Sequence, residues 1–260
     1  MILPNITNNE NKILHYLYSF RFIHTNQFQK LFNHKDKTTV KEWLKDLKDK
    51  GYINKVDNDK DSFEKKTKPT IYCLAPKARH ILKKSEDSDL VVLDKIYREK
   101  KRKPKFVNKC LSIVDMYLFF QSQKEPAQEL EFFTENELVR YKYFPEELPS
   151  AYISISTNGE SERYFLDVFA PNTPAFELRN RVKLYLSYAN SGSWEANTDD
   201  LPLPSILFVC PSKNLKTHIY FFAKAKFEKA FEEKFDLYLT TWEIIQSGNK
   251  NIWEKVTIDK

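Results

Sequence analysis

The sequence predicts an α+β protein, with an N-terminal winged helix-turn-helix followed by an α/β domain with a mixed sheet. Short helical patterns joined by brief turns precede two β-prone segments, and after residue 106 the predicted order becomes α-β-β-β-α-β. Charge separates the halves: residues 1–109 carry 26 basic and 14 acidic side chains, whereas residues 110–260 carry 16 and 22. We therefore expect a winged helix-turn-helix domain at 1–90, a basic linker at 91–106 and the α/β domain at 107–260.

The first domain is expected to contain three helices, a two-stranded wing and a closing helix. Apolar residues recur at helical spacing in the first helix, and Thr25 and Thr38 are suitable N-terminal residues for the next two. Gly51 ends the third helix. The predicted helices are 9–20, 25–32, 38–50 and 75–84, and the predicted strands are 52–56 and 71–74.

The third helix has a basic flank beside its apolar face. At about 100° per residue with Val40 as origin, the apolar side chains lie between about 300° and 40° and the lysines between about 60° and 140°. A helix that enters the DNA major groove needs such a flank, since lysines contact phosphates and N-terminal side chains reach base edges. The alternative is a solvated helix with i,i+4 pairs such as Asp46–Lys50. The candidate DNA-binding residues here are Lys37, Thr38, Lys41, Lys45 and Lys48.

Two further basic segments are candidates for DNA contact. The returning side of the wing carries Lys65, Lys66 and Lys68, and residues 95–109 carry eight basic side chains and one acid, among them Lys100, Lys101, Arg102 and Lys103. Such segments add phosphate contacts and make affinity depend on salt. Pro104 is expected to end any helix in this stretch. The alternatives are a solvated loop and a solvated linker without a partner.

In the α/β domain the hydrophobic period changes from helical to alternating after residue 123. Asn158-Gly159 predicts the turn of a hairpin. The predicted helices are 106–123, 175–189 and 215–234, and the predicted strands are 131–134, 151–156, 164–169, 206–210 and 237–241.

Three local segments resemble those of a known family. They are Leu148-Pro149-Ser150-Ala151 before one strand, Tyr164-Phe165-Leu166-Asp167-Val168 in the next, and Arg181-Val182-Lys183-Leu184-Tyr185-Leu186-Ser187-Tyr188 in the following helix. With the amino-terminal winged helix, this layout resembles the replication-relaxation family of plasmid and mobile-element proteins and is similar to mobilisation relaxases built on the PD-(D/E)XK nuclease fold. The resemblance implies a restriction-endonuclease-like domain with a Pro-Asp pair, a strand carboxylate and a Lys…Tyr helix at these places.

The sequence departs from that nuclease pattern at two of three positions. Such nucleases hold a divalent metal with two carboxylates and place a lysine two residues after the second. Here these positions are Ser150, Asp167 and Phe169. The candidate catalytic residues are therefore Asp167 and, as a migrated ammonium on the following helix, Lys183. Asp167 has an alternative role as a carboxylate satisfied at a strand end, and we expect a degenerate site without a metal or other cofactor, with Mg²⁺ needed only if nuclease activity remains.

Other chemistries are disfavoured. Four glycines in 260 residues disfavour a phosphate-cradling loop, and the five histidines lack metal-ligand spacing. No apolar run reaches the roughly 18 residues of a membrane helix, and residues 1–11 lack the pattern of a signal peptide. Cys73, Cys110 and Cys210 lie far apart in apolar surroundings, which indicates reduced, buried thiols. We expect a cytoplasmic protein without membrane insertion.

Three functional hypotheses follow. The first is a double-stranded DNA-binding protein of a plasmid or mobile element, acting in replication, relaxation or mobilisation at an origin. In it, the acidic C-terminal domain serves as scaffold or contacts other replication or mobilisation proteins. The second is an active metal-dependent relaxase or nuclease. The third is a winged-helix transcriptional regulator whose second domain senses a signal or dimerises.

Overall fold

The computed structural model describes residues 5–56, 69–86, 88–230, 235–247 and 251–258. The chain divides into two compact units, Met1–Gln123 and Lys124–Lys260. Within the described ranges, no helix combines the length and apolar character needed to cross a bilayer.

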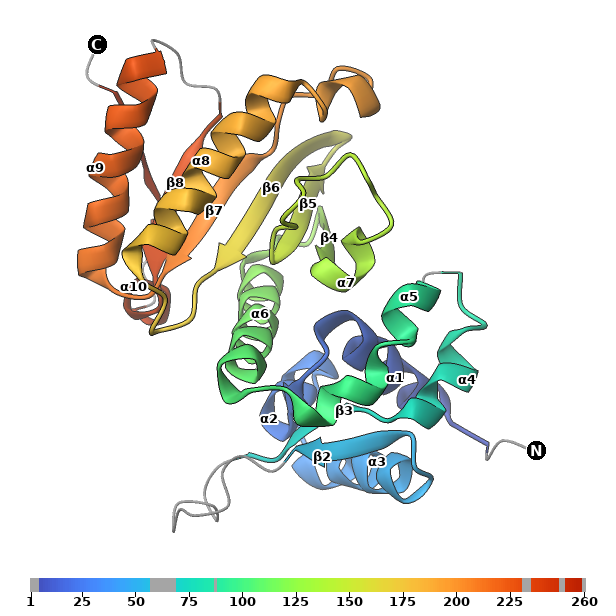
Figure 1. Ribbon diagram of the computed structural model, residues 1–260. Helices are drawn as coiled ribbons and strands as arrows, with labels where there is room; N and C mark the ends of the chain where they lie inside the picture. Colours follow the sequence, from blue (N-terminus) through green and yellow to red (C-terminus); the bar gives the residue numbers. More distant parts are fainter. Residues whose placement is uncertain (1–4, 57–68, 87, 231–234, 248–250, 259–260) are drawn as a thin grey trace. The chain divides into compact units, whose positions relative to one another are not determined.

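The first unit has the element order and sheet of a winged helix-turn-helix (Figure 1). Its three-stranded antiparallel sheet has the order β1-β3-β2, so the first strand pairs with the last. The elements are α1 (Asn8–Phe20), β1 (Ile23–His24), α2 (Thr25–Leu31), α3 (Lys37–Asp49), β2 (Ile53–Val56), β3 (Ile71–Leu74), η2 (Pro76–Ala78), α4 (Arg79–Leu82), α5 (Leu90–Leu93), η3 (Ile96–Lys101) and α6 (Pro104–Gln123).

Local capping explains where the helices of this unit begin. The Thr7 hydroxyl accepts from Glu10 N, and the Glu10 carboxylate accepts from Thr7 N at 2.7 Å, which is a capping box before α1. His24 caps α2 through its ring nitrogen, one residue before the expected Thr25. Asp36 caps α3, two residues before the expected Thr38. Strand β1 was not predicted, because two residues are too short to show a hydrophobic period.

Helix α6 belongs to the first unit, whereas the sequence placed it at the start of the second domain. The buried Gln27 of α2 donates through Nε2 to Leu111 O and to Asp115 Oδ1, each at 2.8 Å. Val107 and Cys110 of α6 pack with Phe22 in one buried cluster. Pro104 begins α6 instead of ending a helix, because the first helical position needs no backbone N–H donor. The change of unit therefore follows Gln123.

The expected linker, 91–106, is largely structured. In η3, Glu99 is 5% exposed and accepts from Arg21 Nη2 at 2.6 Å and from Arg21 Nε at 3.3 Å. The Arg21 guanidinium also lies 4.4 Å from the centre of the Phe106 ring. Ile96 is 5% exposed and adds apolar contact. This basic segment is therefore anchored to the winged helix-turn-helix by a buried ion pair.

The second unit is a six-stranded mixed sheet of order β4-β5-β6-β7-β8-β9. Strands β4, β5 and β6 are antiparallel, β6, β7 and β8 are parallel, and β9 pairs antiparallel with β8. The elements are β4 (Gln128–Thr134), α7 (Glu135–Leu138), β5 (Ala151–Thr157), β6 (Glu160–Val168), α8 (Ala175–Ser191), η4 (Glu195–Asn197), β7 (Ser205–Cys210), α9 (Lys213–Ala230), β8 (Leu237–Thr241), α10 (Trp242–Gln246) and β9 (Glu254–Lys255).

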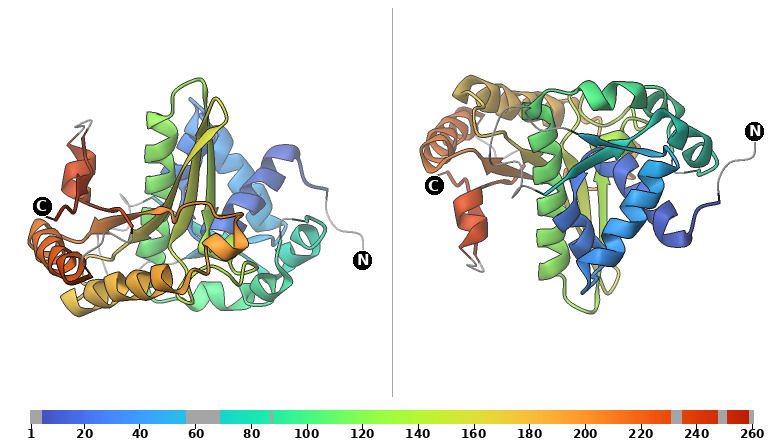
Figure 2. Two further views of the ribbon diagram at one scale, coloured as in Figure 1. Left: turned by 90° about the horizontal axis from the view of Figure 1, so that it is seen from above. Right: turned by 90° about the horizontal axis from the view of Figure 1, so that it is seen from below.

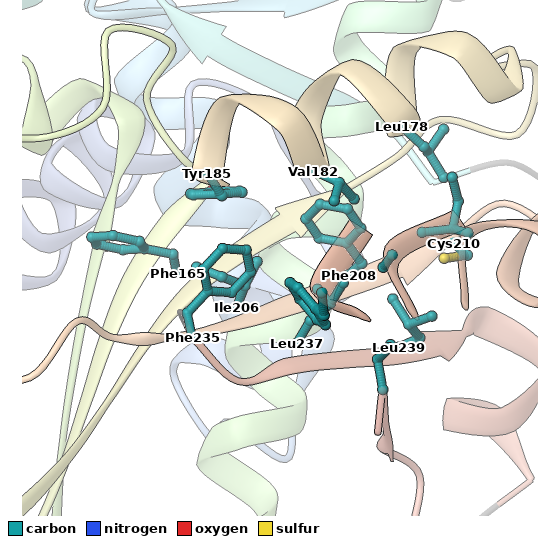
Figure 3. Packing of buried hydrophobic residues seen from close by; sticks show 14 of the residues in the cluster. Phe165, Leu178, Val182, Tyr185, Ile206, Phe208, Cys210, Phe235, Leu237 and Leu239 are labelled. Atoms are coloured by element: carbon teal, nitrogen blue, oxygen red, sulfur yellow. The ribbon is translucent and has the colours of Figure 1, made fainter. Parts of the chain in front are cut away.

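Helices α8 and α9 lie on the same face of β6, β7 and β8 (Figure 2). Leu178, Val182 and Tyr185 point from α8 toward the strands (Figure 3). They meet Phe165 and Phe208, both fully buried. The strand–helix–strand connections through α8 and α9 produce the parallel part of the sheet, as such crossovers must. This face of the sheet also carries the carboxylate that the sequence singled out.

The hairpin of β5 and β6 forms at the predicted turn. Asn158 and Gly159 have φ values of 52° and 90°, the left-handed conformations that a two-residue hairpin turn requires. The register pairs Ala151 with Leu166, and it therefore brings Ser150 beside Asp167 at the end of the hairpin.

Candidate functional site

The lysines of α3 are exposed because the apolar side chains of the helix are buried in the first unit. Val40, Leu44 and Leu47 are each 0% exposed, which fixes the rotation of the helix about its axis. Burying three aliphatic side chains stabilises this orientation by about 1.5–3 kcal/mol each. On the outer side, all five candidate residues are exposed: Lys37, Thr38, Lys41, Lys45 and Lys48.

The ion pairs of α3 lie at its ends and on its acidic flank. Lys48 is 3.6 Å from Asp49, an exposed contact. Lys50 pairs with Asp46 and with the buried Glu10, and the Asp46–Lys50 pair is the i,i+4 pair named for the alternative of a solvated helix. Among the described residues, no acidic side chain forms an ion pair with Lys37, Lys41 or Lys45. A stripe of three cations with no intramolecular carboxylate partner among described residues is suited to contact phosphates.

The N-terminus of α3 is already capped. Asp36 Oδ1 accepts from Thr38 N at 2.7 Å, and this bond from the Thr38 backbone lowers the pKa of the Asp36 carboxyl. Asp36 is therefore ionised at neutral pH beside the first turn. Since the backbone N–H of Thr38 is satisfied by Asp36, contact with DNA at this position would come from the Thr38 side chain.

The other basic candidates differ in their surroundings. Lys65, Lys66 and Lys68 lie outside the described residues. Lys100, Lys101 and Lys103 are exposed. Arg102 is half-buried, with its guanidinium 5.0 Å from the centre of the Phe106 ring and 3.6 Å from Glu99 Oε1. Arg102 thus contributes to packing of the first unit, a role that the run of basic residues did not reveal.

In the second unit, Asp167 lies at the centre of a buried polar cluster. Arg181 Nε donates to Asp167 Oδ2 at 2.6 Å and Arg181 Nη2 donates to Oδ1 at 3.2 Å. The Tyr185 hydroxyl donates to Oδ2 at 2.8 Å, and Ser150 N donates to Oδ1 at 3.3 Å. Arg181 Nη1 also donates to Glu147 O at 2.6 Å. Both carboxylate oxygens are therefore saturated by donors from this chain.

Electrostatics keep the two side-chain donors of this cluster, Arg181 and Tyr185, in their protonated forms. Burial alone would lower the pKa of Arg181, but the charge and hydrogen bonds of Asp167 outweigh it and raise the pKa. Burial and the neighbouring Asp167 charge raise the pKa of Tyr185 well above its ordinary value. Arg181 stays cationic and Tyr185 stays neutral, so both remain donors to Asp167. The Arg181 guanidinium thus supplies the positive charge that neutralises this carboxylate.

These residues do not fit a Mg²⁺ centre. Ser150 stands where the first carboxylate is expected, and its hydroxyl accepts from Val168 N at 3.2 Å. Phe169 stands where the lysine is expected, and its ring packs edge-on to Phe208 with centroids 5.0 Å apart. Mg²⁺ needs oxygen ligands at about 2.0–2.1 Å in octahedral geometry, and the oxygens of Asp167 are taken by cationic and neutral donors. Among the described residues, no group of three or more His, Cys, Asp or Glu side chains is arranged to hold a metal.

The structure does not bring Lys183 to Asp167. Lys183 is exposed on α8, two residues from Arg181 and therefore about 200° around the helix from it. Arg181 and Tyr185, one turn apart, are the residues of α8 that reach Asp167. Both residues lie in the helix segment that resembles the family, but their contact with Asp167 was not predicted from the sequence. The available signal was their i,i+4 spacing on the helix that follows the strand of Asp167.

The fold and the site together define a two-unit protein, with a helical unit that carries a three-stranded antiparallel sheet and a mixed α/β unit in which Arg181 neutralises the buried carboxylate of Asp167. The chain belongs to the replication-relaxation family, whose model matches residues 14–200. That match spans both units, from the first helix to the segment after α8.

Solved structures similar to this chain include two of the restriction endonuclease FokI. FokI bound to DNA matches with a TM-score of 0.30 and 15% identity, covering 95% of this chain and 46% of that chain. A second FokI structure matches with a TM-score of 0.33 and 14% identity, again covering 95% of this chain and 46% of that chain. This chain therefore spans about half the length of the FokI chains. No curated protein matches the sequence.

Proposed function

We propose that this protein binds double-stranded DNA of a plasmid or other mobile element and acts at an origin in replication, relaxation or mobilisation. The observation that carries the proposal is the exposed lysine stripe on α3, the helix that a winged helix-turn-helix presents to the major groove. Membership of the replication-relaxation family supports the biological setting.

Charge supports a division of labour between the units. Residues 1–123 carry 26 basic and 15 acidic side chains, whereas residues 124–260 carry 16 and 21. In this proposal the first unit contacts the phosphate backbone. The acidic second unit contacts other replication or mobilisation proteins, and the exposed rings of Phe176 and Phe221 are candidate contacts for them. The proposed place of action is the cytoplasm, where thiols stay reduced, and all three cysteines are buried.

The test of DNA binding is Lys41→Ala combined with Lys45→Ala. Each lost phosphate contact reduces the slope of log K against log[salt] by about 0.9, so this pair should remove about 1.8. The matched control is Lys142→Ala with Lys183→Ala, two exposed lysines of the second unit, which should leave the slope unchanged. An unchanged slope in a folded α3 double variant would place the DNA elsewhere.

Thr38→Ala tests whether α3 also discriminates between sequences. Side chains at the start of a recognition helix reach base edges, and losing one such contact costs about 1–3 kcal/mol of discrimination. We expect weaker binding to the origin and an unchanged salt slope on unrelated DNA. A footprint on DNA from the origin and on DNA flanking the gene identifies the site. Protection confined to a promoter would favour the regulator hypothesis instead.

A further inference from the structure

The second unit contains an open pocket walled by aromatic rings. Its cavity volume is about 180 Å³, and it lies between β4, β5, β6, the segment after α7 and the segment after α8. In the register of the sheet, Phe133 pairs with Tyr152 and Tyr152 with Phe165, so these rings share the face that packs against α8. Its aromatic walls are Phe133, Tyr141, Tyr143, Phe144, Tyr152 and Trp194.

The rings of this aromatic pocket are held in place by contacts with one another and by hydrogen bonds. Phe144 packs edge-on to Tyr152 and to Trp194, with centroids 5.7 Å and 5.6 Å apart. Trp194 Nε1 donates to Pro202 O at 3.1 Å, and Tyr143 O accepts from the Tyr188 hydroxyl at 2.6 Å. The walls are therefore ordered before any ligand arrives, which reduces the entropy cost of binding.

The pocket contains one cation and no carboxylate among its lining residues. Arg163 lies on β6, and its Nη1 donates to Ser161 O at 3.3 Å. Among the described residues Arg163 forms no ion pair, and its side chain hydrogen-bonds the Tyr152 side chain. Glu131 lies on the same face, two strands away across Ser154, at about 10 Å by the strand spacing. Arg163 is therefore the charged side chain of the pocket lining. Burial raises the pKa of the lining residue Tyr152, and Glu131 is close enough to raise it further.

These features select the chemistry of the ligand. A cation would stack well on the rings but would meet the Arg163 guanidinium with no carboxylate in the lining to balance it. A wholly apolar molecule would cover Arg163 without satisfying its donors, which is costly. A planar ring that carries an anionic group satisfies both parts, because the ring stacks among the aromatic walls and the anion accepts from the guanidinium.

We propose that this pocket binds a nucleotide, with the base among the aromatic rings and the phosphate on Arg163. The same chemistry is presented by a free mononucleotide and by a nucleotide of single-stranded DNA. A base inside a duplex is stacked and cannot enter the pocket. The inference rests on the pocket of the second unit and is independent of duplex binding by α3.

The experiment measures equilibrium binding of four probes to the full-length protein by ligand-detected NMR: dTMP, thymidine, inorganic phosphate and an eight-residue oligo(dT). We expect dTMP to bind about tenfold or more tightly than thymidine, because thymidine lacks the charge-assisted bonds to Arg163. Phosphate alone should not bind measurably. Binding of oligo(dT) at least as tight as dTMP identifies single-stranded DNA as the source. If dTMP binds and oligo(dT) does not, the pocket is a nucleotide site whose ligand is a free nucleotide.

Two substitutions separate the contribution of ring stacking to nucleotide binding from the contribution of the Arg163 charge. Arg163→Gln should abolish the advantage of dTMP over thymidine while leaving thymidine binding unchanged. Tyr141→Ala removes an aromatic ring of the pocket that is 39% exposed. It should weaken the binding of dTMP and of thymidine about tenfold through lost stacking. Lys142→Ala, an exposed neighbour outside the lining, is the control and should bind like wild type.

Two results would overturn the inference. One is the absence of binding by dTMP and oligo(dT) at millimolar concentration in the folded wild-type protein. The other is binding that survives both Arg163→Gln and Tyr141→Ala unchanged. Duplex affinity measured on the same variants is expected to stay at the wild-type level, so failure of the pocket and failure of the α3 proposal are told apart.

Discussion

Arg181 and Asp167 form a two-point ion pair that fastens α8 to the centre of the second unit's sheet. Arg181 is 7% exposed and Asp167 is 6% exposed. Their two hydrogen bonds measure 2.6 Å and 3.2 Å. The Tyr185 hydroxyl joins them, donating to Asp167 while accepting from Arg181 Nη2 at 2.9 Å. The cluster is therefore a structural element whose energetic role can be measured directly.

Removing one charge of this pair should destabilise the second unit more than removing both charges. Asp167→Asn leaves the guanidinium buried without its counter-charge and should lower the free energy of unfolding by about 3–5 kcal/mol. Asp167→Leu with Arg181→Met removes both charges and should recover most of that loss. Hydrogen exchange of the α8 amides reports the stability of this unit in the full chain. A double variant less stable than either single substitution contradicts this account.

We expect no nicking of supercoiled DNA by the purified protein with Mg²⁺ or Mn²⁺. Both oxygens of Asp167 are held by donors of this chain, and Phe169 provides no ammonium to orient a water. The substrate is a plasmid that carries the element's origin, and the readout is conversion to open circles. Nicking by wild type that folded Asp167→Asn and Lys183→Ala variants both lose would show that the second unit is an enzyme.

The anchor of η3 should protect the basic segment from proteolysis. Glu99→Ala leaves Arg21 without its buried partner, and we expect trypsin to cleave within residues 100–103 about tenfold faster through easier local opening. Asp94→Ala is the control, because its ion pair with Arg79 is exposed and exposed pairs contribute little. Equal cleavage of wild type and Glu99→Ala would show that this segment opens without breaking the pair.

The stability of the first unit should fall at alkaline pH through Cys73. Burial raises the pKa of this thiol from an ordinary value of 9.0 to about 12. Because the folded pKa lies above the unfolded one, the stabilisation is fully present below pH 9 and is lost as pH rises toward about 12. Over that range the free energy of unfolding should fall by about 1.4 kcal/mol per pH unit more in wild type than in Cys73→Ala. Denaturant titrations of both proteins from pH 8 to 11 measure the difference, and parallel curves would argue against this role.

The sequence predicted the elements whose pattern is local and long. Val40, Leu44 and Leu47 share one helix face, and this spacing alone oriented the lysines of α3 correctly. Asn158-Gly159 likewise predicted the turn between β5 and β6, since both residues tolerate positive φ. The same logic missed α10 and β9, which are too short to show a period.

The tertiary relationships were less accessible from the sequence. Arg181 meets Asp167 only because the crossover after β6 returns α8 over the strand, and no periodicity encodes that distance. Pro104 was read as an end although it begins α6, because proline is tolerated at a first helical position and disfavoured further inside. Gln27 binds α6 across more than 80 residues of sequence, and therefore the boundary between the units could not be inferred from composition.

The counter-ion of Asp167 is the Arg181 side chain, which is part of the polypeptide and cannot dissociate as a bound ion can. This has an evolutionary consequence. A carboxylate placed at Ser150 would set two negative charges against one guanidinium, and loss of Arg181 alone would leave Asp167 buried and uncompensated. Lysine at position 169 would remove the ring that packs on Phe208. Each single step toward a metal centre therefore crosses a less stable intermediate, so the arginine makes such a centre hard to reach by stepwise mutation.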